Sequence, residues 1–98
     1  MNQLISIMTL NVGMSSSLAG LVTLLSLNSV DLIFLQEVKS STDQLMSILS
    51  GLGFSAEANI NVDFPSSPGT AVIWKQSLPV ENVYTVVSCR AQAVRIGN

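Results

Sequence analysis

The sequence predicts an α/β fold in which two strand–helix units come first and mostly antiparallel strands follow. Residues 4–12 and 32–36 are apolar, partly β-branched runs that are typical of buried strands. Apolar side chains recur at the spacing of an α-helix in two further segments, residues 18–28 and residues 41–52. Beyond residue 53, short apolar runs alternate with Gly, Pro and Ser, which indicates strands joined by turns.

The first strand–helix–strand unit spans residues 4–36. Residues 4–12 predict a strand that is buried on both faces, because polar residues are few in this run. Residues 18–28 follow as a helix, with Leu18, Leu21, Val22 and Leu25 on its apolar side. Asp31 precedes the second strand. A connection through a helix makes the two strands parallel neighbours.

The second helix begins at a capping box formed by Ser41 and Gln44 and ends at Gly51 or Gly53. Its expected apolar face consists of Leu45, Ile48, Leu49 and Leu52. Strands are then expected at residues 54–62, 70–74, 83–87 and 91–96. Short connections between them favour antiparallel pairing.

Composition limits the possible functions. The chain has 98 residues, of which 48% are hydrophobic and 10% charged, whereas about a quarter of a typical domain is charged. A core this apolar predicts either a partner surface or a piece of a larger domain. The net charge of −2 argues against binding nucleic acid through clustered Lys and Arg alone. The chain contains no histidine, the commonest general base.

Several features predict an intracellular protein, and a nuclear location is compatible with them. Cys89 is the single cysteine, so no internal disulfide forms. The first residues lack the positive charge of a secretory signal. The apolar stretch at 18–27 is shorter than the roughly 20 residues that cross a bilayer, and no membrane association is expected.

A candidate site emerges from the geometry of the two parallel strands. Asn11 closes the first strand and Glu37 follows the second, so an amide and a carboxylate should meet at one edge of the sheet. Glu37 could bind Mg²⁺, which prefers oxygen ligands, and Asn11 could position a phosphate or a water. The alternatives are a solvated carboxylate at a strand end and a turn-forming Asn.

The chain also resembles a known family. Five segments, in the expected order, are similar to segments of the endonuclease/exonuclease/phosphatase superfamily: four strands at residues 7–13, 31–37, 69–74 and 90–96, and the glycine-aromatic entry to a strand at residues 51–54. The last stretch most resembles the apurinic-like endonuclease domains of LINE-type retrotransposons.

The resemblance implies a four-layer α/β sandwich and Mg²⁺-dependent cleavage of phosphodiester bonds in DNA. It implies that Glu37 is a metal ligand and that Asn11 orients the phosphate or the metal. A phosphatase or a lipid phosphodiesterase of the same superfamily is the first alternative. A non-catalytic α/β interaction module is the second.

Departures from the family pattern limit the expected activity. The catalytic Tyr, the Asp-x-Asn pair and the late Asp-His pair of family members have no counterpart here, and Pro68 stands where members often have Arg. We therefore expect residues 1–98 to be a partial domain, truncated at its C-terminus. Such a fragment should be inactive alone, marginally stable and a weak Mg²⁺ binder. Its oligomeric state is left open.

Overall fold

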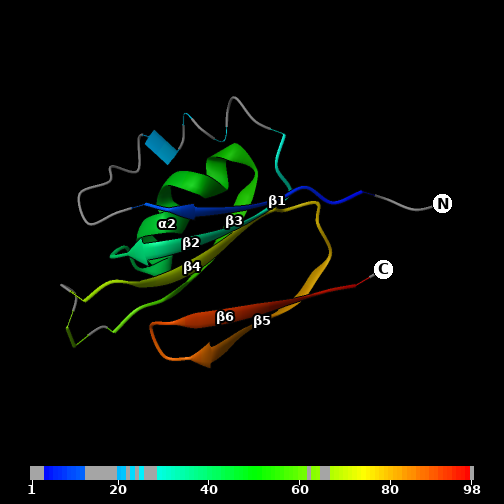
Figure 1. The fold of residues 1–98 in the computed structure, drawn as a ribbon. Coiled ribbons are helices and arrows are strands. Elements are labelled where there is room, and N and C mark those ends of the chain that lie inside the picture. The colour runs from blue at the N-terminus through cyan, green and yellow to red at the C-terminus, as the bar shows by residue number, and fades with distance from the viewer. Residues whose placement is uncertain are drawn as a thin grey trace.

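The computed structural model describes residues 4–12, 20–21, 23, 25, 29–61, 63–64 and 67–97. Its helices and strands are β1 (Ile7–Asn11), β2 (Leu32–Val38), α2 (Thr42–Leu49), the 3-10 turn η1 (Ser50–Leu52), β3 (Phe54–Asn59), β4 (Gly69–Lys75), β5 (Val80–Val87) and β6 (Ala91–Ile96). The strands form a four-stranded sheet of order β1-β2-β4-β3 and a separate β5-β6 hairpin. Helix α2 covers one face of the larger sheet and the hairpin lies on the other (Figure 1). The predicted α/β class is confirmed.

The core lies between the larger sheet and the helical layer. Successive side chains of a strand point to opposite faces, so alternate residues of β2 and β4 face the helices. Ile33 and Ile73 are fully buried there, and Leu45 and Leu49 of α2 are each 1% exposed. Burial of such a side chain contributes roughly 1.5–3 kcal/mol, which makes this contact the main source of stability.

The first predicted helix, at residues 18–28, lies mostly outside the described residues. Gly20, Leu21, Thr23 and Leu25 are described and are helical. Leu21 and Leu25 are buried in the core, as their i, i+4 spacing predicts.

Helix α2 begins as the sequence predicts. The Ser41 hydroxyl accepts a hydrogen bond from the Gln44 N–H at 3.2 Å, and the Ser41 N–H donates to the Gln44 side chain at 2.8 Å. This capping box satisfies two donors that would otherwise lack partners at the helix start. Gly53, at φ 86°, closes the 3-10 turn after the helix. Its left-handed conformation suits a residue without a Cβ.

The predicted apolar face of α2 is partly wrong. Leu45 and Leu49 are buried, but Ile48 is 38% and Leu52 is 46% exposed. The α-helix ends at Leu49, and the tighter winding of η1 then changes the direction in which Leu52 points. Met46 packs against the core instead, with its sulfur 3.1 Å from the Ala56 backbone nitrogen.

Strand β1 corrects the prediction of a strand buried on both faces. Met8 and Leu10 pack against the helix-side core, but Thr9 and Asn11 are exposed and Ile7 is 59% exposed. The reason is its position. β1 is an edge strand, and the hairpin makes its hydrogen bonds with β3 and β4, so it leaves the outer face of β1 uncovered.

The second half of the chain is antiparallel, as predicted. β3 pairs with β4, and β5 pairs with β6, both in antiparallel register. Strand β3 ends at Asn59, earlier than the predicted residue 62. Among the described residues, no helix is both long and apolar enough to cross a membrane.

Candidate functional site

The carboxyl ends of β1 and β2 lie together. Asn11 is the register partner of Gln36 in the parallel pairing, and the Val12 N–H donates to the Gln36 carbonyl at 3.0 Å. Glu37 is the next residue along β2. The parallel pairing on which the predicted site depended is therefore confirmed, and it brings Asn11 and Glu37 to one edge of the sheet.

A β-bulge lies at Glu37. Gln36 pairs with Thr70, and Val38 pairs with the adjacent Gly69, so one residue of β2 has no partner across the ladder. Glu37 is that extra residue, and its backbone has φ 58°. A bulge changes the direction of a side chain and is found preferentially next to active sites. A left-handed conformation at a residue with a Cβ costs about 1–2 kcal/mol.

The bulge decides which face carries the carboxylate. Ile33 and Leu35 point into the helix-side core, and regular alternation would send Glu37 there too. Instead Val38 takes that place in the core, at 3% exposure. Glu37 lines a cleft on the hairpin side of the sheet. The strained backbone thus removes a charge from the apolar core, where it would be costly, and presents it at the cleft.

The cleft lies between the end of β2, the start of β4 and the turn that joins β5 to β6. Its volume is about 610 Å³, within the range of roughly 300–1,000 Å³ that is usual for small-molecule sites. The described residues that line it are Gln36, Glu37, Asn61, Ser67, Pro68, Gly69, Thr70, Ser88, Cys89 and Arg90. Asn11 is not among them; it lies beside Gln36 on the neighbouring strand.

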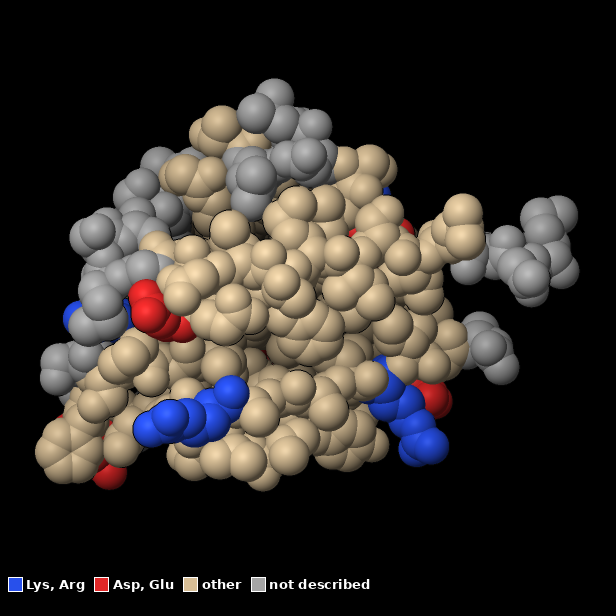
Figure 2. Space-filling model, viewed as in Figure 1, with Lys and Arg blue, Asp and Glu red and all other residues tan. Residues whose placement is uncertain are grey.

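Charge is sparse around this site. Glu37, in β2, and Arg90, in the turn between β5 and β6, are the charged residues among the described lining residues. On the face of the molecule that Figure 2 shows, the described residues are mostly uncharged, with isolated basic and acidic side chains rather than a basic stripe. Binding of an anionic ligand would therefore depend on a few local groups and not on a broad positive field.

Asn59 is the important residue that the sequence analysis missed. It is 6% exposed and is the one buried polar residue among those described. Its side-chain amide donates to the Val87 carbonyl at 3.0 Å and to Thr70 Oγ1 at 3.2 Å, and its Oδ1 accepts from the Cys89 N–H at 3.0 Å. These contacts attach the β5–β6 turn to the larger sheet.

Two further hydrogen bonds fix the hairpin. Thr70 Oγ1 donates to Gln92 Oε1 at 2.8 Å, and Gln92 Nε2 donates to the Glu57 carbonyl at 3.1 Å. In sequence, Asn59 continues an alternation of polar residues with Ser55 and Glu57. Nothing in that pattern distinguishes a buried amide from a solvated one.

Asp31 and Asp43, two acidic residues outside the cleft, have structural positions. Asp31 accepts from the Ser6 N–H at 2.9 Å and lies 3.5 Å from Lys75 Nζ, at the start of β2 and far along the strand from Glu37. Asp43 is exposed in the first turn of α2, where the helix dipole favours it. Trp74 is half-buried on β4.

The donors at the sheet edge suit a hard cation. They are the Glu37 carboxylate and the side-chain oxygens of Gln36 and Asn11, all oxygen ligands as Mg²⁺ prefers. The described residues contain no group of three His, Cys, Asp or Glu that could hold a metal. Mg²⁺ is often held by one or two carboxylates with waters and substrate phosphate, so one carboxylate fits part of such a site.

Comparison with known proteins gives one family. The model of the Endonuclease/Exonuclease/phosphatase family matches residues 8–92. No curated protein and no solved structure gives a significant match. The matched range runs from β1 into β6 and includes Asn11, Glu37 and every described residue that lines the cleft.

Proposed function

The chain belongs to the Endonuclease/Exonuclease/phosphatase family, and from this premise we propose that it carries the metal-binding end of a Mg²⁺-dependent phosphodiesterase site for DNA. The observation that carries the proposal is the bulge at Glu37, where a strained backbone presents a carboxylate to the cleft. Backbone strain at a non-glycine residue is found preferentially at functional sites.

The roles of the residues follow from their positions. Glu37 would hold Mg²⁺, and Asn11, next to Gln36 at the same sheet edge, would orient a phosphate oxygen or a metal-bound water. The chemistry that Mg²⁺ supplies when bound is neutralisation of phosphoryl charge and activation of water. The bulge fixes the direction of the Glu37 carboxylate before any ligand arrives, which reduces the entropy lost on binding.

Hydrolysis also needs a base, and the sequence has no histidine to provide an imidazole. We propose that these residues form the N-terminal part of a longer domain, of the type found in LINE-type retrotransposons. The general base and further metal ligands would then come from downstream sequence. Residues 90–96 favour DNA as the substrate, because they most resemble the retrotransposon endonucleases, and a DNA substrate implies a nuclear location.

The proposal is tested by a Mg²⁺ titration followed by ¹H–¹⁵N NMR. Mg²⁺ should shift the amides of residues 36–38 and 69–70, and Glu37→Gln should abolish these shifts because the amide keeps the shape and loses the charge. Asp43→Asn is the matched control, since Asp43 is an exposed carboxylate on α2, away from the cleft. Shifts that survive in Glu37→Gln would contradict the proposal.

The alternatives have distinct outcomes. A non-catalytic interaction module predicts no response of the cleft amides to Mg²⁺ and no change in the thermal melt. A lipid phosphodiesterase predicts that vesicles containing phosphoinositides bind the chain in Mg²⁺ more tightly than an abasic DNA duplex does. The proposed function predicts the reverse order, and Glu37→Gln should weaken the binding of the duplex.

A further inference from the structure

We propose that Asn59 is a positioning residue, which holds the β5–β6 turn at the cleft so that Arg90 binds a phosphate group across from Glu37. The inference rests on the proposed function, because it assigns the phosphate-binding partner of the same cleft. It concerns a buried amide that touches no substrate itself and acts through the turn at Ser88, Cys89 and Arg90.

The contacts of Asn59 are directed at this turn. Its Nδ2 donates to the carbonyl of Val87 at 3.0 Å and of Ala91 at 3.4 Å, which are the residues on either side of the turn. Its Oδ1 accepts from the Cys89 N–H, within the turn, at 3.0 Å. One side chain therefore holds both ends and the middle of the turn. An amide is the only neutral group that donates twice and accepts in one plane.

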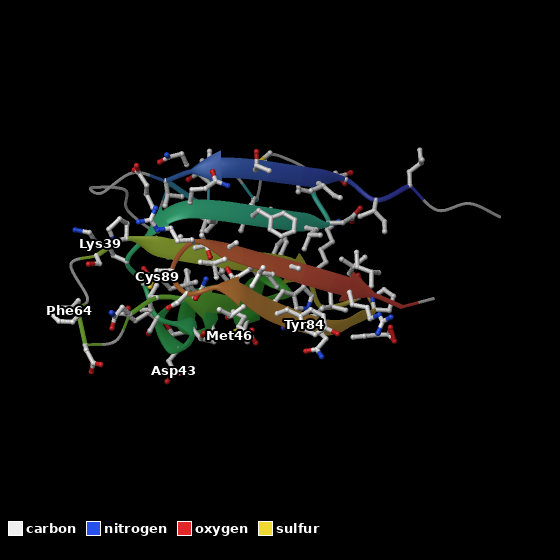
Figure 3. The ribbon with its side chains drawn as sticks, turned by 60° about the horizontal axis from the view of Figure 1, so that its bottom comes forward. Lys39, Asp43, Met46, Phe64, Tyr84 and Cys89 are labelled. Atoms are coloured by element: carbon white, nitrogen blue, oxygen red, sulfur yellow. The ribbon has the colours of Figure 1, made fainter. Side chains whose placement is uncertain are left out.

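The turn itself is strained in the same way as the bulge. Cys89 has φ 59°, and among the described residues Glu37 and Cys89 are the two non-glycine residues with positive φ. Both line the cleft. Figure 3 shows Cys89 at the same end of the molecule as Lys39, which follows β2. One residue in β2 and one in the β5–β6 turn, both lining one cleft, thus have a left-handed backbone, which indicates that the cleft shape is under local constraint.

Arg90 has the chemistry to bind an anion here. It is exposed, lines the cleft and is absent from the ion pair between Lys75 and Asp31, the one found among the described residues. A guanidinium donates two parallel hydrogen bonds to phosphate oxygens, and these charge-assisted bonds are about twice as strong as neutral ones. A phosphate between Arg90 and a metal on Glu37 would have positive charge on two sides.

The test uses inorganic phosphate as the probe and the Nε–Hε signals of the arginines as the readout. Phosphate should shift the Arg90 signal more than that of Arg95, which is exposed on β6 outside the cleft. Arg90→Gln should weaken phosphate binding on the order of tenfold, as expected for one charge-assisted contact. Arg95→Gln is the matched control and should leave it unchanged. Equal shifts at the two arginines would overturn the proposal.

A double-mutant cycle tests whether Asn59 acts through Arg90 or merely stabilises the fold. With the amide of Cys89 as reporter, Asn59→Ala should weaken phosphate binding about fivefold to tenfold in the native background. In the Arg90→Gln background the same change should cost less than about twofold. Equal losses in both backgrounds would overturn the positioning role. If Asn59→Ala does not fold, Asn59→Asp, which keeps an oxygen in the place of Oδ1 but loses both N–H donors, takes its place with the same two outcomes.

The Mg²⁺ titration separates failure of this inference from failure of the proposed function. If the Mg²⁺ response is lost in Glu37→Gln but phosphate binding is unchanged in Arg90→Gln, this inference alone is overturned. Phosphate binding at Arg90 without any Mg²⁺ response at residues 36–38 overturns the proposed function, and with it the role of Arg90 in that function.

Discussion

In the four-stranded sheet, Ile33, Val72 and Ile73 are completely buried, whereas every residue of β5 and β6 is half-buried or exposed. The sheet is packed by apolar side chains against helices. The hairpin lies on the opposite face, where Leu32 and Val72 are buried, and is attached there by hydrogen bonds from Asn59 and Thr70. The comparison shows that the hairpin half of the cleft depends more on polar contacts than the helix-packed half does.

This difference has a consequence for the site. An isolated two-stranded hairpin is at best marginally stable, so β5–β6 depends on its attachment to the larger sheet. Glu37 belongs to the well-packed half, and Arg90 belongs to the polar-attached half. Glu37 should therefore stay fixed under conditions in which Arg90 moves away from the cleft.

The largest expected effect is on stability, where a truncated side chain in the core of the larger sheet should cost far more than one in the hairpin. Ile33→Ala should lower the free energy of unfolding by about 2–5 kcal/mol, because it leaves a cavity in the core. Val86→Ala on β5, where the side chain is 62% exposed, should change it by less than about 0.5 kcal/mol. Urea unfolding followed by circular dichroism measures both, and similar losses would remove the distinction between the halves.

A smaller effect is expected at the attachment point. Asn59→Ala should cost about 1–3 kcal/mol, because it leaves the Cys89 N–H and the Val87 carbonyl without their partner. Hydrogen exchange should accelerate at the amides of β5 and β6 and remain slow in β2 and β4. Uniform acceleration across both sheets would mean that the hairpin is an integral part of the core.

The smallest effect lies away from the cleft. Ser41→Ala should lower the stability by about 1 kcal/mol, because the capping box of α2 loses its acceptor. A thermal melt measures the loss, and Ser47→Ala, on the exposed side of the same helix, is the control. The shifts caused by Mg²⁺ at residues 36–38 should be the same in both variants.

The sequence predicted those parts of the fold that depend on local chemistry. The capping box at Ser41, the strand at Ala91–Ile96 and the parallel pairing of β1 with β2 are all as expected. The exposure of Ile7 was not predicted, because apolar content gives no information about which strand lies at a sheet edge.

Asn11 and Glu37 remain predicted site residues: their placement at one sheet edge follows from the parallel pairing that the sequence predicts, but the bulge does not. Glu37 was found because a carboxylate ends an apolar run, yet that run gives no sign of a bulge. A bulge depends on the register with β4, which is a tertiary property. A Cβ at Gly69, opposite the bulge, would collide with the Asn59 carbonyl oxygen. The bulge therefore lies beside the end of β3, and no local sequence pattern shows that these two segments are close.

The central claim is that the strained backbone at Glu37 presents its carboxylate to Mg²⁺ at the cleft. Glu37→Gly tests it most directly, because glycine adopts φ 58° without a steric cost. The free energy of unfolding in urea should rise by about 1 kcal/mol while the Mg²⁺ shifts of residues 36–38 disappear. A less stable variant, or one that still responds to Mg²⁺, would contradict the account.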